Sequence, residues 1–423
     1  MTAIAIATAR PTGLPTRSFA NAILWLAVFL GGFVFVEPAP YDLFLVLIIP
    51  LWMLVGFNVP RATGPLILLM FVFLAGGIIA TTQAAHFETQ PIYMAVTAFL
   101  AVSACFYACI VAEDPKRLDV IVSAWIAAAL VTAILGICGY FGLTGELFVK
   151  FGRAAGGFGD PNVFGPFLIL PFLVLARRAL TGSPGQVLLS SVLAMVIFSG
   201  IFLSFSRATW GATALGTLVL AVLLYATDRR PLMRARYIAI AAMGVVLMTL
   251  LVMVALSIPA VSELFADRAQ LVQDYDSRHM GRFERHAAGF NLMLDHPLGI
   301  GAMEFGKIFS EDEHNIWLKL LTTYGWLGFV AFLTLVVWSL LAALPLLFRT
   351  GKLQAITQVA YVVFVCHVIM GLVIDIDHWR HVFMLLGILW GAVAVDRGAR
   401  QLRLSARRPD MSVETGGLAP GAA

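Results

Sequence analysis

The chain of 423 residues is 60% hydrophobic and only 12% charged, and its mean hydropathy is +0.91. Soluble domains carry about 25% charged residues, so this composition excludes a soluble protein and indicates a membrane protein. The formal net charge is +4, and we expect membrane lipids rather than nucleic acid as partners. All four cysteines lie inside apolar runs, where they are predicted to be packing residues and not a disulfide framework.

Apolar runs near the roughly 20 residues needed to cross a bilayer recur along the chain. They predict an all-α integral membrane protein with about twelve transmembrane helices. The expected spans are residues 20–36, 41–57, 65–81, 92–112, 118–141, 163–176, 187–204, 209–226, 237–257, 326–347, 354–374 and 382–395. The first run has no small-x-small cleavage site and further spans follow it, so we interpret it as an anchor and not as a cleaved signal peptide.

The basic residues orient these spans, because short cytoplasmic loops collect lysine and arginine. When both termini are placed in the cytoplasm, most of the 28 lysines and arginines fall on the cytoplasmic side. The C-terminal tail begins with basic residues and ends in a stretch rich in Gly, Pro and Ala, a composition typical of disorder. The predicted organisation is a cytoplasmic tail at 1–19, nine spans within 20–257, an outer segment at 258–325, three spans within 326–395 and a cytoplasmic tail at 396–423.

The outer segment is too long for an idle connector, so we expect functional residues in it. It predicts short amphipathic helices, the clearest of which runs from Arg282 to Leu294 and lies at the membrane surface. Arg282, Arg285 and His286 fall on the polar side of this helix. The alternatives are a solvated face or a contact with anionic lipid. The apolar residues that recur at helical spacing are Phe283, Ala287, Phe290 and Leu294.

Two shorter outer loops add further arginines. The stretch "KFGRAAGGFGDPNVFG" carries Arg153 in a glycine-rich turn and ends in Asp160-Pro161-Asn162, which can cap a following helix. The stretch "SFSRATW" places Arg207 between two spans on the outer side, where an uncompensated cation is disfavoured. The alternatives are a re-entrant or capping loop for the first stretch and an arginine that reaches the headgroups for the second.

The last outer loop, "DIDHWRH", places His378, Arg380 and His381 at the start of the final span. A His-x-x-His pair can ligate zinc, but the spacing indicates no third ligand, so we expect no metal site. Polar support for a site, or anchoring at the interface, is the expected role of these side chains.

The stretch "EDEHNIWLKLLTTYGWLG" places His314 just outside the membrane, at the start of a helical run that Gly325 and Gly328 are expected to interrupt. An imidazole changes its protonation state near neutral pH, and the carboxylates of Glu311 and Glu313 are expected to favour its protonated form. Such a group can take a proton from an acceptor hydroxyl. The alternative interpretation is an exposed or capping histidine.

Arginines gathered from separate loops onto one face need an anionic partner. A pyrophosphate fits this requirement, because guanidinium groups pair with phosphate through two hydrogen bonds and stay charged at every relevant pH. The sequence therefore predicts a lipid-linked pyrophosphate as the ligand on the outer side.

The motifs "GRAAGGFGDPN", "SFSRATW", "GRFERHAAGFNLMLDHPLGIGAMEF" and "EHNIWLKLLTTYGWLG" resemble, in order and in placement, the O-antigen ligase and O-antigen polymerase-like superfamily. The similarity covers about residues 150–328, and its most specific element is the His-Asn pair, the apolar run and the Gly-x-x-Gly that follow one another. Members of the superfamily are polytopic inner-membrane enzymes that move glycans from undecaprenyl pyrophosphate to a lipid or glycan hydroxyl in the periplasm.

The resemblance implies a metal-independent inverting transfer without a cofactor, with the outer segment in the periplasm. It implies catalytic roles for Arg207, Arg282 and His314. The sequence departs from the family pattern at Thr323 and Tyr324, where an acidic residue is common, and its outer segment is short. The residues expected to bind substrate are Arg153, Asn162, Arg285, Asn315, Arg380 and His381.

Three alternatives stay open at this point. A polymerase of the same superfamily uses the same donor and differs in its acceptor. A metal-dependent polyprenol glycosyltransferase could use the acidic residues at 37–42, 274–276 and 375–377. A lipid-linked-sugar flippase or secondary transporter would need ionisable groups near the bilayer midplane, and His367 is the clearest of these.

Overall fold

The computed structural model describes residues 14–268 and 281–405. Nearly all of its regular structure is helical, and the named strands of the described part form one two-stranded antiparallel hairpin. The predicted all-α membrane fold is therefore confirmed. The acidic motif at 274–276 and the ends of both tails lie outside the described residues.

The elements follow the order of the predicted spans. The first helices are α1 (Leu14–Leu30), α2 (Pro40–Gly56), α3 (Gly64–Thr81), α4 (Gln90–Glu113) and α5 (Arg117–Tyr140), with the turn η1 (Arg61–Thr63) before α3. Next come η2 (Glu146–Phe148), β1 (Val149–Lys150), β2 (Arg153–Ala154), α6 (Pro161–Thr181), α7 (Pro184–Leu203), α8 (Arg207–Thr227), α9 (Pro231–Leu256) and α10 (Pro259–Arg268). The last elements are α12 (Arg282–Asp295), α13 (Phe305–Phe309), α14 (Ile316–Ala343), η3 (Leu344–Leu347), α15 (Gln354–Met370) and α16 (Arg380–Ser405).

Among the described residues, nine helices are long and apolar enough to cross a membrane, compared with the expected number of about twelve. The three other expected spans are the shorter apolar helices Arg17–Leu30, Pro40–Gly56 and Gln354–Met370. The first of these ends early because Gly31 and Gly32 follow it and their N–H groups close a turn on Val28 and Phe29. The nine long helices confirm a polytopic protein, and the exact count of twelve is not confirmed.

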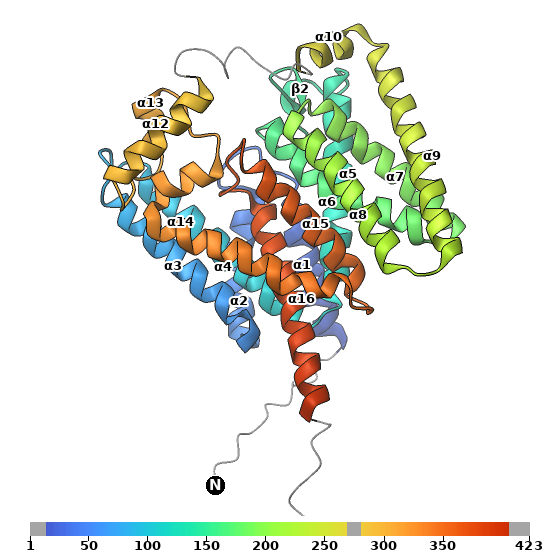
Figure 1. Ribbon diagram of the computed structural model, residues 1–423, viewed down its shortest axis with the longest axis horizontal. Coiled ribbons are helices and arrows are strands. Elements are labelled where there is room, and N and C mark those ends of the chain that lie inside the picture. Colours follow the sequence, from blue (N-terminus) through green and yellow to red (C-terminus); the bar gives the residue numbers. More distant parts are fainter. Residues whose placement is uncertain (1–13, 269–280, 406–423) are drawn as a thin grey trace, which may run out of the picture.

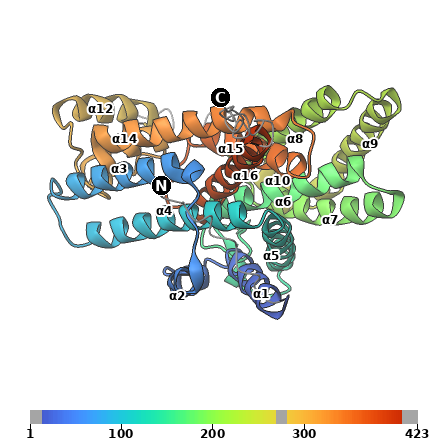
Figure 2. The ribbon, with the colours of Figure 1, turned by 90° about the horizontal axis from the view of Figure 1, so that it is seen from below.

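The helices form two groups on either side of α16 (Figures 1 and 2). In one group α14 packs against α3, and α12 packs on α14. In the other group α6 packs against α7, and α7 packs against α5. Helix α9 lies at the margin of this second group, and no residue in its most apolar stretch is buried.

Helix α14 begins ten residues earlier than the expected span, and it contains the predicted break. Gly325 has φ of 64°, a left-handed conformation that favours glycine, and the two helical parts meet there. Gly328 stays helical, so the expected second interruption is wrong. A Cβ on the facing Gly76 would lie 2.6 Å from the Gly328 nitrogen, so the two glycines allow α3 and α14 to approach closely.

Candidate active site

His314 is held in a strained backbone conformation at the end of the bundle where α8 and α14 begin, called the His314 end below. Its φ is 46°, which costs a residue with a side chain on the order of 1 kcal/mol. Hydrogen bonds hold the peptide groups on both sides. The Nε2–H of His286 donates to the carbonyl oxygen of Glu313 at 2.7 Å, and the N–H of Asn315 donates to Asp375 Oδ1 at 3.0 Å. The fold therefore fixes the direction in which the imidazole leaves the chain.

Asn315 caps the helix that follows His314. Its Oδ1 accepts from the N–H groups of Trp317 at 2.9 Å and Leu318 at 3.3 Å, and its Nδ2 donates to the Leu372 carbonyl at 3.2 Å. Asparagine is a favoured N-cap because its side chain satisfies otherwise unpaired donors of the first turn. Asn315 therefore links the start of α14 to the loop between α15 and α16 through these hydrogen bonds.

That loop supplies a carboxylate to the site. Burial raises the pKa of Asp375, while the charges of Lys319 and His314 favour its ionised form. The Lys319 ammonium lies 3.3 Å from Asp375 Oδ2, and both side chains are largely buried. The next acidic residue, Asp377, accepts from the Tyr93 hydroxyl at 2.5 Å and the Tyr324 hydroxyl at 3.2 Å. Lys319 of α14 therefore holds Asp375, while Tyr93 of α4 and Tyr324 of α14 hold Asp377.

Two carboxylates expected beside His314 are engaged elsewhere. Glu311 forms an ion pair with Arg285 of α12. Glu313 points into the protein, where its Oε1 accepts from the Thr322 hydroxyl at 2.6 Å, and burial raises its pKa to about 7. The carboxylate on which the charge of His314 acts is instead Asp375, from the distant α15–α16 loop.

Helix α12 turns its cationic side toward the protein. Arg285 is buried, while Phe283, Phe290 and Leu294 are 69%, 46% and 57% exposed. The apolar stripe thus faces outward, as expected for a helix that lies on a membrane surface. Burial lowers the pKa of His286, and the charges of Arg282 and Arg285 lower it further. Arg282, Arg285 and His286 consequently share one electrostatic environment, which also includes Asp375.

A second cationic cluster forms where α6 and α8 begin. Buried Arg153 donates from Nε to the Ser204 carbonyl at 2.6 Å and from its terminal nitrogen to Asn162 Oδ1 at 2.8 Å. Arg207 starts α8 three residues after Ser204. Asp160 caps α6, as predicted, by accepting from the N–H of Asn162. The structure therefore brings Arg153, Asn162 and the Arg207 turn together.

The two clusters are connected through the loop between α1 and α2. Val34 exchanges backbone hydrogen bonds of 2.6 and 3.0 Å with Gly157 and Gly159, just after the Arg153 hairpin. Arg380 donates two hydrogen bonds to Glu37 of the same loop, at 3.1 and 3.2 Å, and two to Asp42 at the start of α2, at 2.7 and 2.5 Å. Arg380 thus joins this loop to the Asp375 loop, and its charge is balanced by two carboxylates.

His381 lies apart from Arg153, Arg207 and the arginines of α12, although it follows Arg380 in α16. It is buried between α15 and α16, with its Nε2 3.1 Å from Nε2 of His367. His367 donates from Nδ1 to the Val363 carbonyl at 2.8 Å, so its Nε2 accepts the proton that His381 offers. The structure does not bring His381 to His314.

The carboxylates at 37–42 and 375–377 that were considered as metal ligands have protein partners. Arg380 engages Glu37 and Asp42, and Asp375 and Asp377 are held as described above. Within residues 14–268 and 281–405, no group of three or more His, Cys, Asp or Glu side chains is arranged to hold a metal ion.

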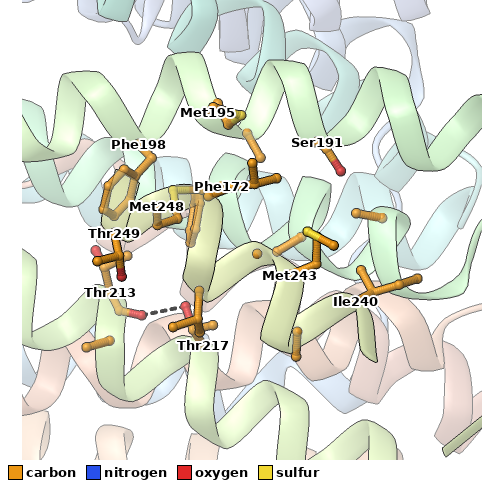
Figure 3. A pocket seen from close by; sticks show the side chains of 18 of the residues that line it. Phe172, Ser191, Met195, Phe198, Thr213, Thr217, Ile240, Met243, Met248 and Thr249 are labelled. Atoms are coloured by element: carbon orange, nitrogen blue, oxygen red, sulfur yellow. Dashed lines mark hydrogen bonds between the residues drawn. The ribbon is translucent and has the colours of Figure 1, made fainter. Parts of the chain in front are cut away.

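An apolar cavity of about 1040 Å³ lies between α9 and helices α6, α7 and α8. Figure 3 shows side chains from all four helices around it, among them Phe172, Met195, Phe198 and Met248. The hydroxyl of Thr217 donates to the Thr213 carbonyl of its own helix at 2.7 Å, so it offers little polarity to a ligand.

One end of the cavity lies near the start of α8, where the second cationic cluster forms. Phe202 and Trp210 line this end, and Trp210 is three residues from Arg207. Phe265 of α10 packs on both rings, with centroid distances of 6.0 and 5.5 Å. The other end reaches Leu180 and Val187, so the cavity follows the membrane-crossing direction. An apolar chain with an anionic head would meet apolar walls and then cations.

Sequence reasoning missed several of these residues. Lys319 carries a signal, because a single charge within an apolar run at a membrane boundary indicates a buried partner. His286 was placed on the polar side of its helix, but its contact with the peptide before His314 depends on tertiary packing. The apolar cavity leaves no local pattern, since its lining residues resemble any packed helix face.

The fold and the site together define a polytopic α-helical membrane protein with arginine, histidine and carboxylate side chains gathered at one membrane surface. The family model described as O-antigen ligase matches residues 190–333, which include Arg207, Arg282 and His314. The resemblance to the O-antigen ligase superfamily is therefore confirmed for this segment. No curated protein matches the chain.

Proposed function

We propose that the protein transfers a glycan from a polyprenyl-pyrophosphate carrier to a hydroxyl acceptor at the periplasmic face of the inner membrane. One observation carries the proposal. His314 is fixed in a strained conformation, and the peptide group before it is bound by His286 of α12, the helix that carries Arg282 and Arg285. It lies at the same end of the bundle as Arg207 and the Trp210 end of an apolar cavity. The O-antigen ligase match over residues 190–333 supports it.

The arginines hold the pyrophosphate in this proposal. Arg207 stands at the first residue of α8, where the free N–H groups and the helix dipole also favour an anion. Arg282 occupies the same position in α12. Guanidinium groups bind phosphate in a planar, two-bonded arrangement, and they stabilise the charge that develops as the glycosidic bond breaks.

The polyprenyl chain occupies the cavity beside α9. Its walls are apolar, and its Trp210 end places the first isoprene units next to Arg207. Helix α9 packs sparsely on the bundle, so the chain can enter from the lipid between α9 and its neighbours. In this position the polyprenyl chain contacts the apolar walls of the cavity, and the pyrophosphate lies beside the arginines.

His314 acts as the general base. The acceptor oxygen bonds to the anomeric carbon while the bond from that carbon to the pyrophosphate oxygen breaks, and the electron pair leaves with the pyrophosphate. The acceptor proton passes to the imidazole, which lies close enough to Asp375 for the two charges to interact. Attack from the face opposite the leaving group inverts the anomeric configuration.

The test is glycan transfer by the purified protein with a carrier-linked glycan and a hydroxyl acceptor. We expect His314→Ala, Arg207→Ala and Arg282→Ala each to lower the rate by on the order of 100-fold or more. The matched controls are His86→Ala, an exposed histidine at the same end, and Arg178→Ala at the opposite end. Equal rates for site variants and controls would refute the assignment.

The acceptor distinguishes a ligase from a polymerase. Deletion of the gene would abolish attachment of the finished glycan if the acceptor is another lipid or protein. It would shorten the glycan if the acceptor is a second carrier-linked unit. We favour the ligase, because the matching family model carries that description.

A further inference from the structure

The β1–β2 hairpin presents an aromatic residue at a turn that glycine and asparagine normally occupy. Phe151 and Gly152 connect the strands with φ of 54° and 68°, the geometry of a type I′ turn. Phe151 is nevertheless 78% exposed. A strained residue whose side chain makes little contact with its own protein indicates a role toward something outside it.

Phe151 belongs to a group of exposed apolar side chains on two neighbouring loops. Phe35 and Phe148 join these loops, with ring centroids 5.9 Å apart. The exposed fractions of Val36, Leu143, Leu147 and Phe151 are 73%, 75%, 58% and 78%. We call these four residues the hairpin group.

The chain keeps the hairpin group close to the membrane. Helix α5 is a candidate span that ends at Tyr140, and three residues reach at most about 11 Å, so Leu143 stays near the interface. The hairpin then folds back along α5. A Cβ on Gly139 would lie 3.0 Å from the Phe148 Cβ, and one on Gly136 would lie 3.1 Å from the Gly156 nitrogen. The base of the hairpin thus packs on the last two turns of the span.

The outward surface of α5 continues in the same direction. Val131, Ile134 and Phe141 are 38%, 49% and 46% exposed and recur at helical spacing toward the hairpin. Lipid chains cover such a surface along the span. Headgroups lie within roughly 5 to 8 Å beyond the hydrocarbon core, so the hairpin group continues this surface into the interfacial layer.

We propose that the β1–β2 hairpin is an interfacial anchor, inserted with Phe151 leading into the lipid headgroup layer at the His314 end. The occupant of this surface is the bilayer itself, and not a second copy or a partner protein. The anchor also sets the position of the candidate active site along the membrane normal. Arg153 follows Phe151 by two residues and bonds to the Ser204 carbonyl, three residues before Arg207. This last step rests on the proposed function.

The test measures the surroundings of position 151 in full-length protein reconstituted in phospholipid nanodiscs. A nitroxide is attached to Phe151→Cys and, in separate variants, to Val222→Cys on an exposed face of α8 and Glu88→Cys in the exposed α3–α4 loop. Unaltered protein gives the background from its four native cysteines. Relaxation of the nitroxide by oxygen indicates that the label lies in lipid, and relaxation by a water-soluble nickel chelate indicates that it lies in water.

We expect oxygen to relax the label at position 151 several-fold more than the nickel chelate does, as at position 222, with the reverse at position 88. Preferential access by the nickel chelate would overturn the anchor. Exclusion of both reagents would also overturn it, because a second copy or another protein would then cover the hairpin. The measurement needs neither donor nor acceptor, so it decides the anchor independently of the transfer reaction.

A pair of substitutions tests whether the hairpin fixes the position of the site relative to the membrane. Phe151→Trp keeps an aromatic residue suited to the interface, whereas Phe151→Asp places a charge there. We expect glycan transfer to fall several-fold in the Asp variant and to stay within twofold in the Trp variant, with equal apparent melting temperatures. Equal transfer rates in the two variants would show that the hairpin does not determine the position of the site relative to the membrane.

Discussion

Replacing Glu313 by Gln should change how the stability of the protein depends on pH. The carboxyl group is buried and receives a hydrogen bond from Thr322, and burial raises its pKa from the ordinary 4.5 to about 7. Below pH 4.5 the group is protonated in both the folded and the unfolded protein. Between pH 4.5 and 7 it ionises in the unfolded protein first, so stability falls as the pH rises.

The loss follows from the two pKa values. The interval between 4.5 and about 7, at about 1.36 kcal/mol per pH unit, corresponds to roughly 3 kcal/mol lost by pH 8. Glutamine does not ionise, so Glu313→Gln should gain about this much relative to the native protein between pH 4 and pH 8. The assay is the apparent melting temperature in detergent at several pH values.

Glu311→Gln is the control, because that carboxylate is half exposed and pairs with Arg285 of α12. Its melting curve should follow that of the native protein across the same pH range more closely than the Glu313 variant does. Parallel pH profiles for the native protein and the Glu313 variant would refute the assignment of a buried, protonated carboxyl group at this position.

Three further results are expected. Gly325→Ala should destabilise the protein by roughly 2 kcal/mol or more, since φ is 64° and the new Cβ would lie 2.7 Å from the Leu298 carbonyl; an unchanged melting temperature would contradict this. Ala221→Phe should fill the cavity and raise KM for the carrier at least tenfold with little change in kcat, whereas Val222→Phe, on an exposed position of α8, should leave both unchanged. Excess chelator should leave transfer unchanged, and loss of activity restored by a divalent cation would favour a metal-dependent enzyme.

Local patterns predicted the parts of the fold that depend on neighbouring residues. The apolar stripe of α12 and the helix break at Gly325 follow from spacing and from backbone preference. The Asp160 cap follows from the chemistry of a helix start. The early end of α1 at Leu30 also had a local signal, since two glycines follow it, but the apolar run beyond them concealed it.

Partners distant in the sequence could not be predicted in the same way. Arg380 was expected to bind substrate, yet it pairs with Asp42, 338 residues earlier. Glu313 was expected beside the imidazole of His314, yet the strained backbone there turns the two side chains apart. Which of several available charges a side chain meets depends on how the helices pack, and a single sequence does not encode this in any local pattern.

The central claim is that guanidinium groups from α8 and α12 hold one pyrophosphate beside His314. Its most direct test is the affinity of the purified protein for undecaprenyl pyrophosphate, measured for Arg207→Ala, Arg282→Ala, the double variant and His314→Ala. We expect each arginine variant to weaken binding at least tenfold, the double variant to weaken it by less than the product of the two, and His314→Ala to bind normally without transferring glycan. Native affinity in both single arginine variants would contradict the account.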